Sequence, residues 1–99
     1  MNIETNDTTL LIDDITELTA ANSGEFKNEI RANISQFLKE IIIDCSAIEF
    51  IDSSGLGSLI SINKSANEVG AELMLKSPSP TATQLLELTR LHRILKITN

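Results

Sequence analysis

Aromatic residues and positive charge are scarce in this chain of 99 residues, and each shortage argues against a class of function. Aromatic side chains make up 3% of the sequence, with no Trp and no Tyr, so the stacking platforms of single-stranded nucleic-acid binders are missing. Eight Lys and Arg against 14 Asp and Glu give a net charge of −6, which repels a phosphate backbone. We therefore expect no direct binding of nucleic acid.

Cysteine, histidine and long apolar runs are equally rare. Cys45 is the only cysteine, so it forms no intramolecular disulfide, and with one His it supplies too few ligands for a structural zinc site. A lone thiol is typical of a reducing compartment, so we expect a cytoplasmic protein.

The longest aliphatic runs, at Leu10 to Ile12 and Ile41 to Ile43, are far shorter than the roughly 20 residues of a membrane helix. Met1 to Asp7 carry no secretory signal. We expect no cofactor, no metal and no membrane insertion.

The residues that are present suit one small folded domain. Hydrophobic residues form 41% of the chain and charged residues 22%, which is enough apolar surface to offset the entropy of folding. A chain of this length holds one compact domain, here residues 1–99. We expect that domain to fold alone and to be a monomer when free.

Apolar periodicity in the first half predicts strands around a helix. Asn2 to Thr5 and Thr8 to Ile12 predict a hairpin. Thr19 is a good N-cap for an amphipathic helix over residues 20–38. The stripe of that helix is formed by Phe26, Ile30, Ile34, Phe37 and Leu38. The β-branched run Ile41 to Ile43 predicts a central strand covered on both faces.

The second half repeats the alternation. A helix is predicted from Ser54 to its stop at Gly70. Its apolar stripe is formed by Leu56, Leu59, Ile60 and Ala66. The remaining elements are strands at Leu73 to Leu75 and Ile94 to Ile97, and a third helix that starts with the cap Ser79 and Pro80 and ends near Thr89.

Strands that alternate with helices predict an α/β fold. We expect a mostly parallel sheet of four to five strands, an N-terminal hairpin strand at its edge, and three to four helices. Partner and ligand sites of such sheets form in the loops after the carboxyl ends of the strands. Three loops qualify here: Asp13 to Asn22, Asp44 to Gly57, and Lys76 to Pro80.

The middle loop contains the most informative segment, Asp52-Ser53-Ser54-Gly55-Leu56-Gly57. It opens a helix, and a helix start presents unpaired N–H groups and a partial positive charge that favour an anion. Phosphorylation of Ser53 would place its negative charge over this end with little rearrangement of the fold. The simpler interpretation is that Asp52, Ser53 or Ser54 is only an N-cap. From the residues alone both readings stay open, and the simpler one is favoured.

The same segment resembles the phosphorylation loop of STAS domains, a family that includes bacterial anti-sigma factor antagonists. The resemblance extends over nearly the whole chain, from Ile41 to Ile43 before Asp44 to the C-terminal stretch Leu88 to Ile97. It implies partner switching. The unphosphorylated protein binds an anti-sigma factor that is also an ATP-dependent serine kinase, the kinase phosphorylates Ser53, affinity falls, and a serine phosphatase reverses the change.

The resemblance also implies a binding surface and no catalytic residue. Its centre is formed by Asp52, Ser54, Gly55, Leu56 and Gly57, with help from Thr19, Asn22, Ser77 and Pro78. Thr19 stands where the family often has an aspartate. Arg90 and His92 stand where some members have a glycine and an aromatic residue.

Other functions remain open at this point. STAS domains also serve lipid-transport ABC complexes and stress-sensing assemblies.

A receiver domain would use Asp13, Asp14, Asp44 and Lys76, but the chain is about one strand and one helix too short for that fold. A hydrolase with Ser53 or Ser54 as nucleophile has only His92 as a base, without an evident orienting partner. Cys45, at the end of a buried strand, is expected to be a small core residue and not a reactive thiol.

Overall fold

Five strands form the main sheet of the computed structural model, which describes residues 1–99. Their spatial order is β1 (Asn2–Thr5), β2 (Thr9–Asp13), β4 (Glu40–Asp44), β6 (Glu72–Lys76) and β7 (Lys96–Thr98). Strand β1 is antiparallel to β2, and every other neighbouring pair is parallel. The predicted α/β fold with a hairpin strand at the edge of a mostly parallel sheet is therefore confirmed.

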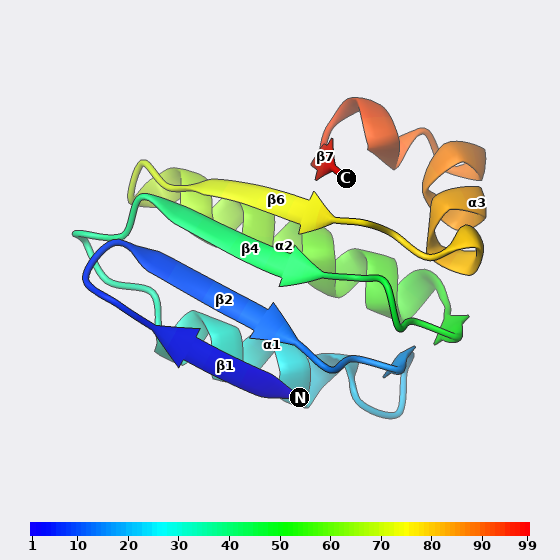
Figure 1. The fold of residues 1–99 in the computed structure, drawn as a ribbon, viewed down its shortest axis with the longest axis horizontal. Coiled ribbons are helices and arrows are strands. Elements are labelled where there is room, and N and C mark those ends of the chain that lie inside the picture. Colours follow the sequence, from blue (N-terminus) through cyan, green and yellow to red (C-terminus); the bar gives the residue numbers. More distant parts are fainter.

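Two long helices lie on one face of this sheet and leave the other face open (Figure 1). They are α1 (Ser23–Ala32) and α2 (Ser53–Glu68), which also pack against each other. The shorter α3 (Pro80–Leu88) and the 3-10 helix η1 (Leu91–Arg93) connect β6 to β7. A second, two-stranded parallel sheet joins β3 (Glu17–Leu18) to β5 (Phe50–Ile51). These two short strands were not predicted, because two residues show no periodicity.

The central strand β4 is covered on one face only, which corrects the expectation of burial on both. Ile41 and Ile43 point toward the helices and are fully buried, whereas Ile42 points the other way and is only half-buried. Neighbouring strands repeat this alternation, so the core lies between the sheet and the two long helices. The uninterrupted isoleucine run thus reflects β-branched strand propensity as well as burial.

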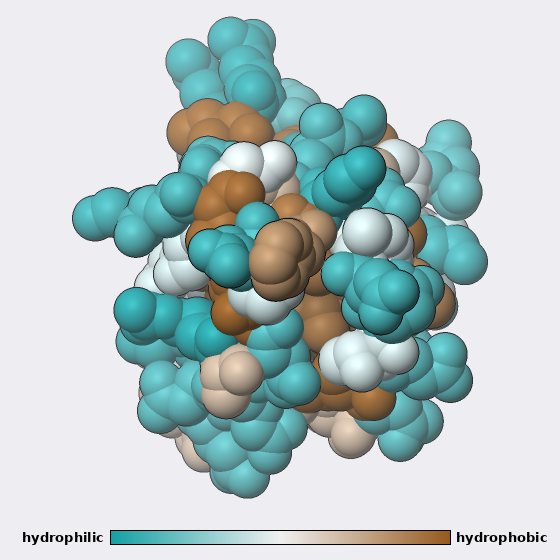
Figure 2. Space-filling model, turned by 90° about the vertical axis from the view of Figure 1, so that its left-hand side faces the viewer, coloured by the Kyte–Doolittle hydropathy of each residue, from teal (hydrophilic) through white to brown (hydrophobic).

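Helix α1 is much shorter than the predicted span of residues 20–38. Its start is delayed because Thr19 and Asn22 form a hydrogen-bonded turn ahead of it. It ends at Ala32, where Asn33 bonds back to the carbonyl of Glu29. Phe37, predicted to be a core residue, therefore lies in the following loop and is 69% exposed. Figure 2 shows the end of the molecule to which this loop belongs: hydrophilic residues surround a small group of apolar ones.

The other elements match their predictions more closely. Gly70, with φ of 78°, follows the end of α2, and the predicted strand around Leu73 is β6. Ser79 caps α3 with Pro80 in its first turn, as predicted. Two predicted details, one in the apolar stripe of α2 and one at the start of the last strand, are wrong. Ile60 of α2 is exposed while Ile62 is buried, and the last strand begins at Lys96, later than expected.

Candidate functional site

Asp52 holds the start of α2 in place. Its Oδ1 accepts a hydrogen bond of 3.0 Å from the N–H of Gly55, which makes it the side-chain N-cap of the helix. Its Oδ2 accepts a second bond of 3.1 Å from the N–H of Ala20. These two backbone bonds, that of Gly55 first, lower the pKa of the Asp52 carboxyl. The carboxylate is therefore ionised at neutral pH and ties the loop before α1 to the first turn of α2.

Gly55 allows this first turn to approach the small sheet closely. A Cβ atom at this position would overlap the backbone carbonyl oxygen of Leu18 in β3. Leu18 is fully buried, and its carbonyl also accepts a bond of 3.3 Å from the N–H of Asp52. Gly57, one residue past Leu56, meets nothing within 4 Å of the same virtual atom, so its small size serves no packing demand. The two glycines of the motif thus have different roles.

Ser53 is the first residue of α2, and its side chain is exposed, as is that of Ser54. The N–H of Ser53 has no acceptor within the chain. Residues at spacings of four and three share one side of a helix. Gly57 lies four residues after Ser53, and Ile60 lies three residues after Gly57. Both are exposed. An open strip therefore runs along α2 away from Ser53, whereas the buried Leu56 faces the core beneath it.

Sequence reasoning missed two exposed apolar residues near Ser53 in the sequence. Ile60 was assigned to the core, although its spacing from Ser53 already places it on the exposed side of α2. Phe50, in β5, is 62% exposed and lies two residues before Asp52. No periodic signal marks it, because β5 is only two residues long. We call Phe50, Ser53, Ser54, Gly57 and Ile60 the α2 surface.

The turn that contains the predicted Thr19 and Asn22 is joined to Asp52 through Ala20, but Thr19 is not the N-cap of α1. The cap position is Asn22, whose side chain instead turns back. Its Oδ1 accepts a bond of 2.9 Å from the N–H of Thr19, and its Nδ2 donates to the carbonyl of Glu17 at 2.6 Å. The result is a rigid turn that presents the N–H of Ala20 to Asp52.

Ser77 and Pro78 make no hydrogen bond to the start of α2. Ser77, with φ of 49°, donates its N–H to the carbonyl of Thr98 at 2.7 Å. The neighbouring Ser79 bonds to the carbonyls of Cys45 and Ile48. No hydrogen bond connects Ser77 or Pro78 to residues 52–57, so the structure joins the loop before α3 to the loop after β4 instead.

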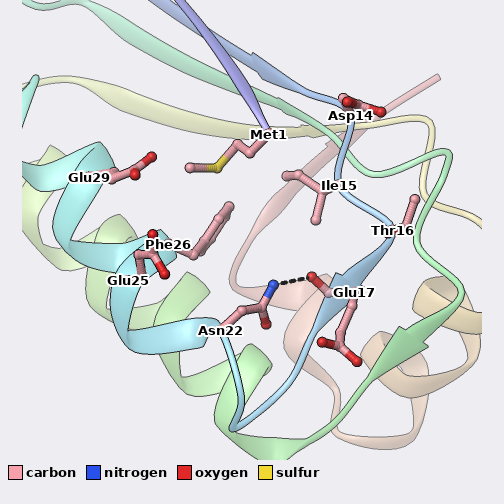
Figure 3. Close-up of a pocket in the computed structure, with 9 residues that line it drawn as sticks. All are labelled: Met1, Asp14, Ile15, Thr16, Glu17, Asn22, Glu25, Phe26 and Glu29. Atoms are coloured by element: carbon pink, nitrogen blue, oxygen red, sulfur yellow. Dashed lines mark hydrogen bonds between the residues drawn. The ribbon is translucent and has the colours of Figure 1, made fainter.

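A hollow of about 380 Å³ lies beside the turn at Asn22 (Figure 3). Phe26, Ile15 and Met1 form its apolar part. Four carboxylates also line it, those of Asp14, Glu17, Glu25 and Glu29, and no Lys or Arg does. Nowhere in the chain do three or more His, Cys, Asp or Glu side chains group in a way that could hold a metal ion. The hollow is therefore an acidic recess and not a metal centre.

The structure also shows the surroundings of the residues that a catalytic thiol, a hydrolase or a receiver domain would need. Cys45 is buried in the core, and this burial, with a contribution from the charge of Asp44, raises the pKa of its thiol to about 12, which disfavours the nucleophilic thiolate. His92 is exposed, and its Nδ1 lies 3.3 Å from the carbonyl of Leu86 at the end of α3. The Ser46 side chain and N–H lower the pKa of Asp44, which lies opposite Lys76 on β6. None of the helices has the length and apolar character needed to cross a membrane.

Comparison with known proteins decides the family. The sequence profile of the STAS domain matches residues 1–99. The chain belongs to the STAS domain family. A relative from Thermotoga neapolitana, a TM1081 homologue assigned as an anti-sigma factor antagonist, is 35% identical over 85 residues, which are 82% of this chain and 73% of the relative.

Solved structures of the family agree with the fold. The crystal structure of TM1081 from Thermotoga maritima, also assigned as an anti-sigma factor antagonist, superposes with a TM-score of 0.84 at 29% identity over 99% of this chain and 85% of that one. The anti-sigma factor antagonist SpoIIAA in its unphosphorylated form gives a TM-score of 0.84 at 23% identity over 99% and 87%. Its phosphorylated form from Bacillus gives 0.75, over 99% and 90%. At that identity SpoIIAA shows the fold alone.

Proposed function

We propose that this STAS domain is an anti-sigma factor antagonist of the cytoplasm, itself without enzymatic activity, that works by partner switching. Unphosphorylated, it binds an anti-sigma factor serine kinase through the α2 surface. The kinase uses ATP to phosphorylate Ser53, the complex separates, and a serine phosphatase restores the binding form. The protein thereby regulates sigma-factor-dependent transcription.

The position of Ser53 carries the proposal. Its hydroxyl is exposed at the first residue of a helix whose cap is supplied by another residue, Asp52. A kinase therefore reaches the hydroxyl without unfolding the helix start. The phosphoryl group would bring about −1.5 to −2 charges to the positive end of α2, beside an N–H without an acceptor. We expect the fold to tolerate the modification.

The same modification is expected to disrupt docking. Asp52 is already ionised next to Ser53, so a partner that covers this surface would have to bury a phosphate beside a carboxylate. Burying an imperfectly paired charge costs several kcal/mol, and 1.4 kcal/mol corresponds to a tenfold change in affinity. A fall in affinity of about a hundredfold or more follows. Because the phosphate adds no strain inside the domain, the change acts on the complex and not on the fold.

The relatives support this proposal in a general way. The two Thermotoga relatives, each 35% identical over 85 residues, are assigned as anti-sigma factor antagonists. SpoIIAA, which shares the fold, is described both as an anti-sigma factor antagonist and in a phosphorylated form. The relatives thus support the antagonist role, and the phosphorylated form of SpoIIAA supports control by phosphorylation.

Substitution of Ser53 tests the switch. Full-length protein with Ser53→Ala serves as bait in a pull-down from the cytoplasm of its own cell, beside Ser53→Asp and the control Gln36→Ala, which changes an exposed residue of the loop between α1 and β4. We expect Ser53→Ala and Gln36→Ala to recover an ATP-binding serine kinase, and Ser53→Asp to recover about a hundredfold less. Thermal unfolding should be nearly the same for all three. Equal recovery by Ser53→Ala and Ser53→Asp would refute the switch, and recovery of an ABC transporter subunit would favour a lipid-transport role.

Direct detection of the modification is the second test. Protein is purified from its own cell with and without phosphatase inhibitors, and its peptides are analysed by mass spectrometry. We expect phosphate on Ser53 and none on Ser54, with a larger modified fraction when phosphatases are inhibited. Acid-stable phosphate identifies a phosphoserine, whereas loss to hydroxylamine would place an acyl phosphate on Asp44 and support a receiver-like chemistry. Persistent absence of phosphate on Ser53 would contradict the proposal.

A further inference from the structure

The open face of the main sheet carries an ordered pattern that the phosphorylation switch does not use. Leu11, Ile42 and Met74 are register partners on three adjacent strands, β2, β4 and β6. Their side chains point away from α1 and α2, since their strand neighbours are buried in the core. Leu11 remains 40% exposed. These three residues, which we call the apolar row, cross the sheet at right angles to the strands.

Charged residues extend and flank the apolar row. Glu4 on β1 pairs with Leu11, and Lys96 on β7 pairs with Met74, so the row ends in a charge at each side. On the same face, further charged residues lie two positions before or after the residues of the apolar row along their strands. They are Glu40 and Glu72 on one flank, and Asp13, Asp44 and Lys76 on the other.

Negative charge dominates this face. Five carboxylates, those of Glu4, Asp13, Glu40, Asp44 and Glu72, accompany two lysines. Lys96 is bound to Glu72 at 2.8 Å, the one salt bridge of the chain, and Lys76 faces Asp44. Glu4 and Asp13 thus have no cationic partner. A hollow of about 330 Å³ lies among these residues, lined by Glu4, Leu11, Asp13, Ile42, Asp44 and Met74 among others.

We propose that this face docks a basic amphipathic helix of a partner protein, independently of Ser53. Neighbouring strands lie about 4.8 Å apart, close to the 5.4 Å pitch of an α-helix, so apolar side chains on successive helical turns match the apolar row. Glu40 and Asp44 are four residues apart on β4, which places the two acidic flanks about 13 Å from each other. That width accommodates a helix about 10 to 12 Å across and lets Lys or Arg on both of its sides meet the carboxylates.

Charge also selects against the simplest alternative, a second copy of this chain. Pairing the face with itself would bring its carboxylates together, in a protein whose net charge is already −6. A basic helix reverses the sign of that interaction. It would also cover the 40% of Leu11 that is exposed on this face.

Titration of the isotope-labelled full chain tests this docking. The probe is a synthetic amphipathic helix of about four turns, with Leu on one side and Lys on the other. NMR amide shifts are expected at the apolar row and not at Ser53 or Phe37. Leu11→Ser should weaken binding about tenfold, because the exposed apolar surface of Leu11 would be removed from water only in the complex. Phe37→Ser, which removes an exposed apolar residue at another site, and Ser53→Asp should each change affinity less than twofold.

Three results would overturn the proposal. A scrambled peptide of the same composition that binds equally well would show that charge alone attracts the probe. Shifts centred on Glu25 and Glu29 would place the binding in the acidic recess instead. Concentration-dependent dimers in sedimentation that Leu11→Ser abolishes would make a second copy the occupant. Failure of this docking can be distinguished from failure of the phosphorylation switch, because Ser53→Asp is expected to bind the peptide as the parent does.

Discussion

Helices α2 and α3 begin with the same local device and use it differently. Both start near the carboxyl edge of the sheet with a side chain that accepts an N–H bond from the first turn, Asp52 from Gly55 and Ser79 from Ala82. Asp52 is charged, partly open to solvent and followed by exposed serines, whereas the Ser79 hydroxyl is neutral and buried. A cap becomes a candidate switch only where solvent and a partner reach its helix.

The largest expected effect lies at the start of α2. Gly55→Ala places a Cβ atom against the carbonyl oxygen of Leu18, and neither backbone segment can move without disturbing the Asp52 bonds. We expect a loss of about 3 kcal/mol or more in the free energy of unfolding, measured by urea denaturation.

Gly57→Ala is the matched control for that prediction. Nothing lies within 4 Å of the added atom, and alanine favours a helix more than glycine does. We expect this variant to gain about 0.5 to 1 kcal/mol. Similar losses at both glycines would mean that the close approach to β3 is not what requires Gly55.

Ser79→Ala should have the next largest effect. The variant loses the cap of α3 and leaves the buried carbonyl of Ile48 without the 2.7 Å bond from the Ser79 hydroxyl. The two losses together amount to about 2 to 3 kcal/mol. Thr81→Ala, in the exposed first turn of the same helix, should stay within about 0.5 kcal/mol of the parent. A Ser79→Ala variant as stable as Thr81→Ala would remove the distinction between a buried and an exposed cap.

Acid pH separates the charged cap from the neutral one. The Asp52 pKa is lower in the folded chain than its ordinary value of 3.8, so at acid pH the unfolded chain takes up this proton first. Its contribution to stability is therefore present above pH 3.8 and is lost as the pH falls through the folded pKa. Asp52→Asn should be less stable than the parent at neutral pH and approach it in acid, in urea titrations at several pH values.

An exposed loop acid supplies the reference for that experiment. Asp7→Asn removes a carboxylate that makes no hydrogen bond through its side chain. The variant should stay within about 0.5 kcal/mol of the parent at neutral pH, as is usual for an exposed substitution. If Asp52→Asn kept a constant difference from the parent down to acid pH, the stabilising role of the ionised cap would be wrong.

Sequence reasoning located the cap Ser79, and narrowed the cap of α2 to Asp52, Ser53 or Ser54, because these signals are local. Ser79 before Pro80, and the Gly70 stop after an apolar stripe, are each specified by a few adjacent residues. The same holds for the hairpin and for β4 and β6. The mostly parallel sheet then follows from the alternation of strands and helices.

Some of what sequence reasoning missed is local, and the rest depends on contacts between distant residues. The end of α1 was placed too late because the apolar stripe outweighed the turn chemistry of Asn33. Exposure of Ile60 depends on which side of α2 the sheet covers, and the bond from Ala20 to Asp52 joins residues 32 positions apart. The open face of the sheet escaped notice because an isoleucine run looks the same whether one face or both are covered.

The ends of the two helices offer the smallest and last comparison. A left-handed residue follows each of them, Gly70 with φ of 78° after α2 and Arg90 with φ of 61° after α3. A side chain in this conformation costs roughly 1 kcal/mol, which glycine avoids. Arg90→Gly should therefore raise the free energy of unfolding by about 0.5 to 1 kcal/mol, and Gly70→Ala should lower it by about 1 kcal/mol. A lower urea midpoint for Arg90→Gly would instead show that the arginine side chain stabilises the turn into η1 by more than its backbone conformation costs.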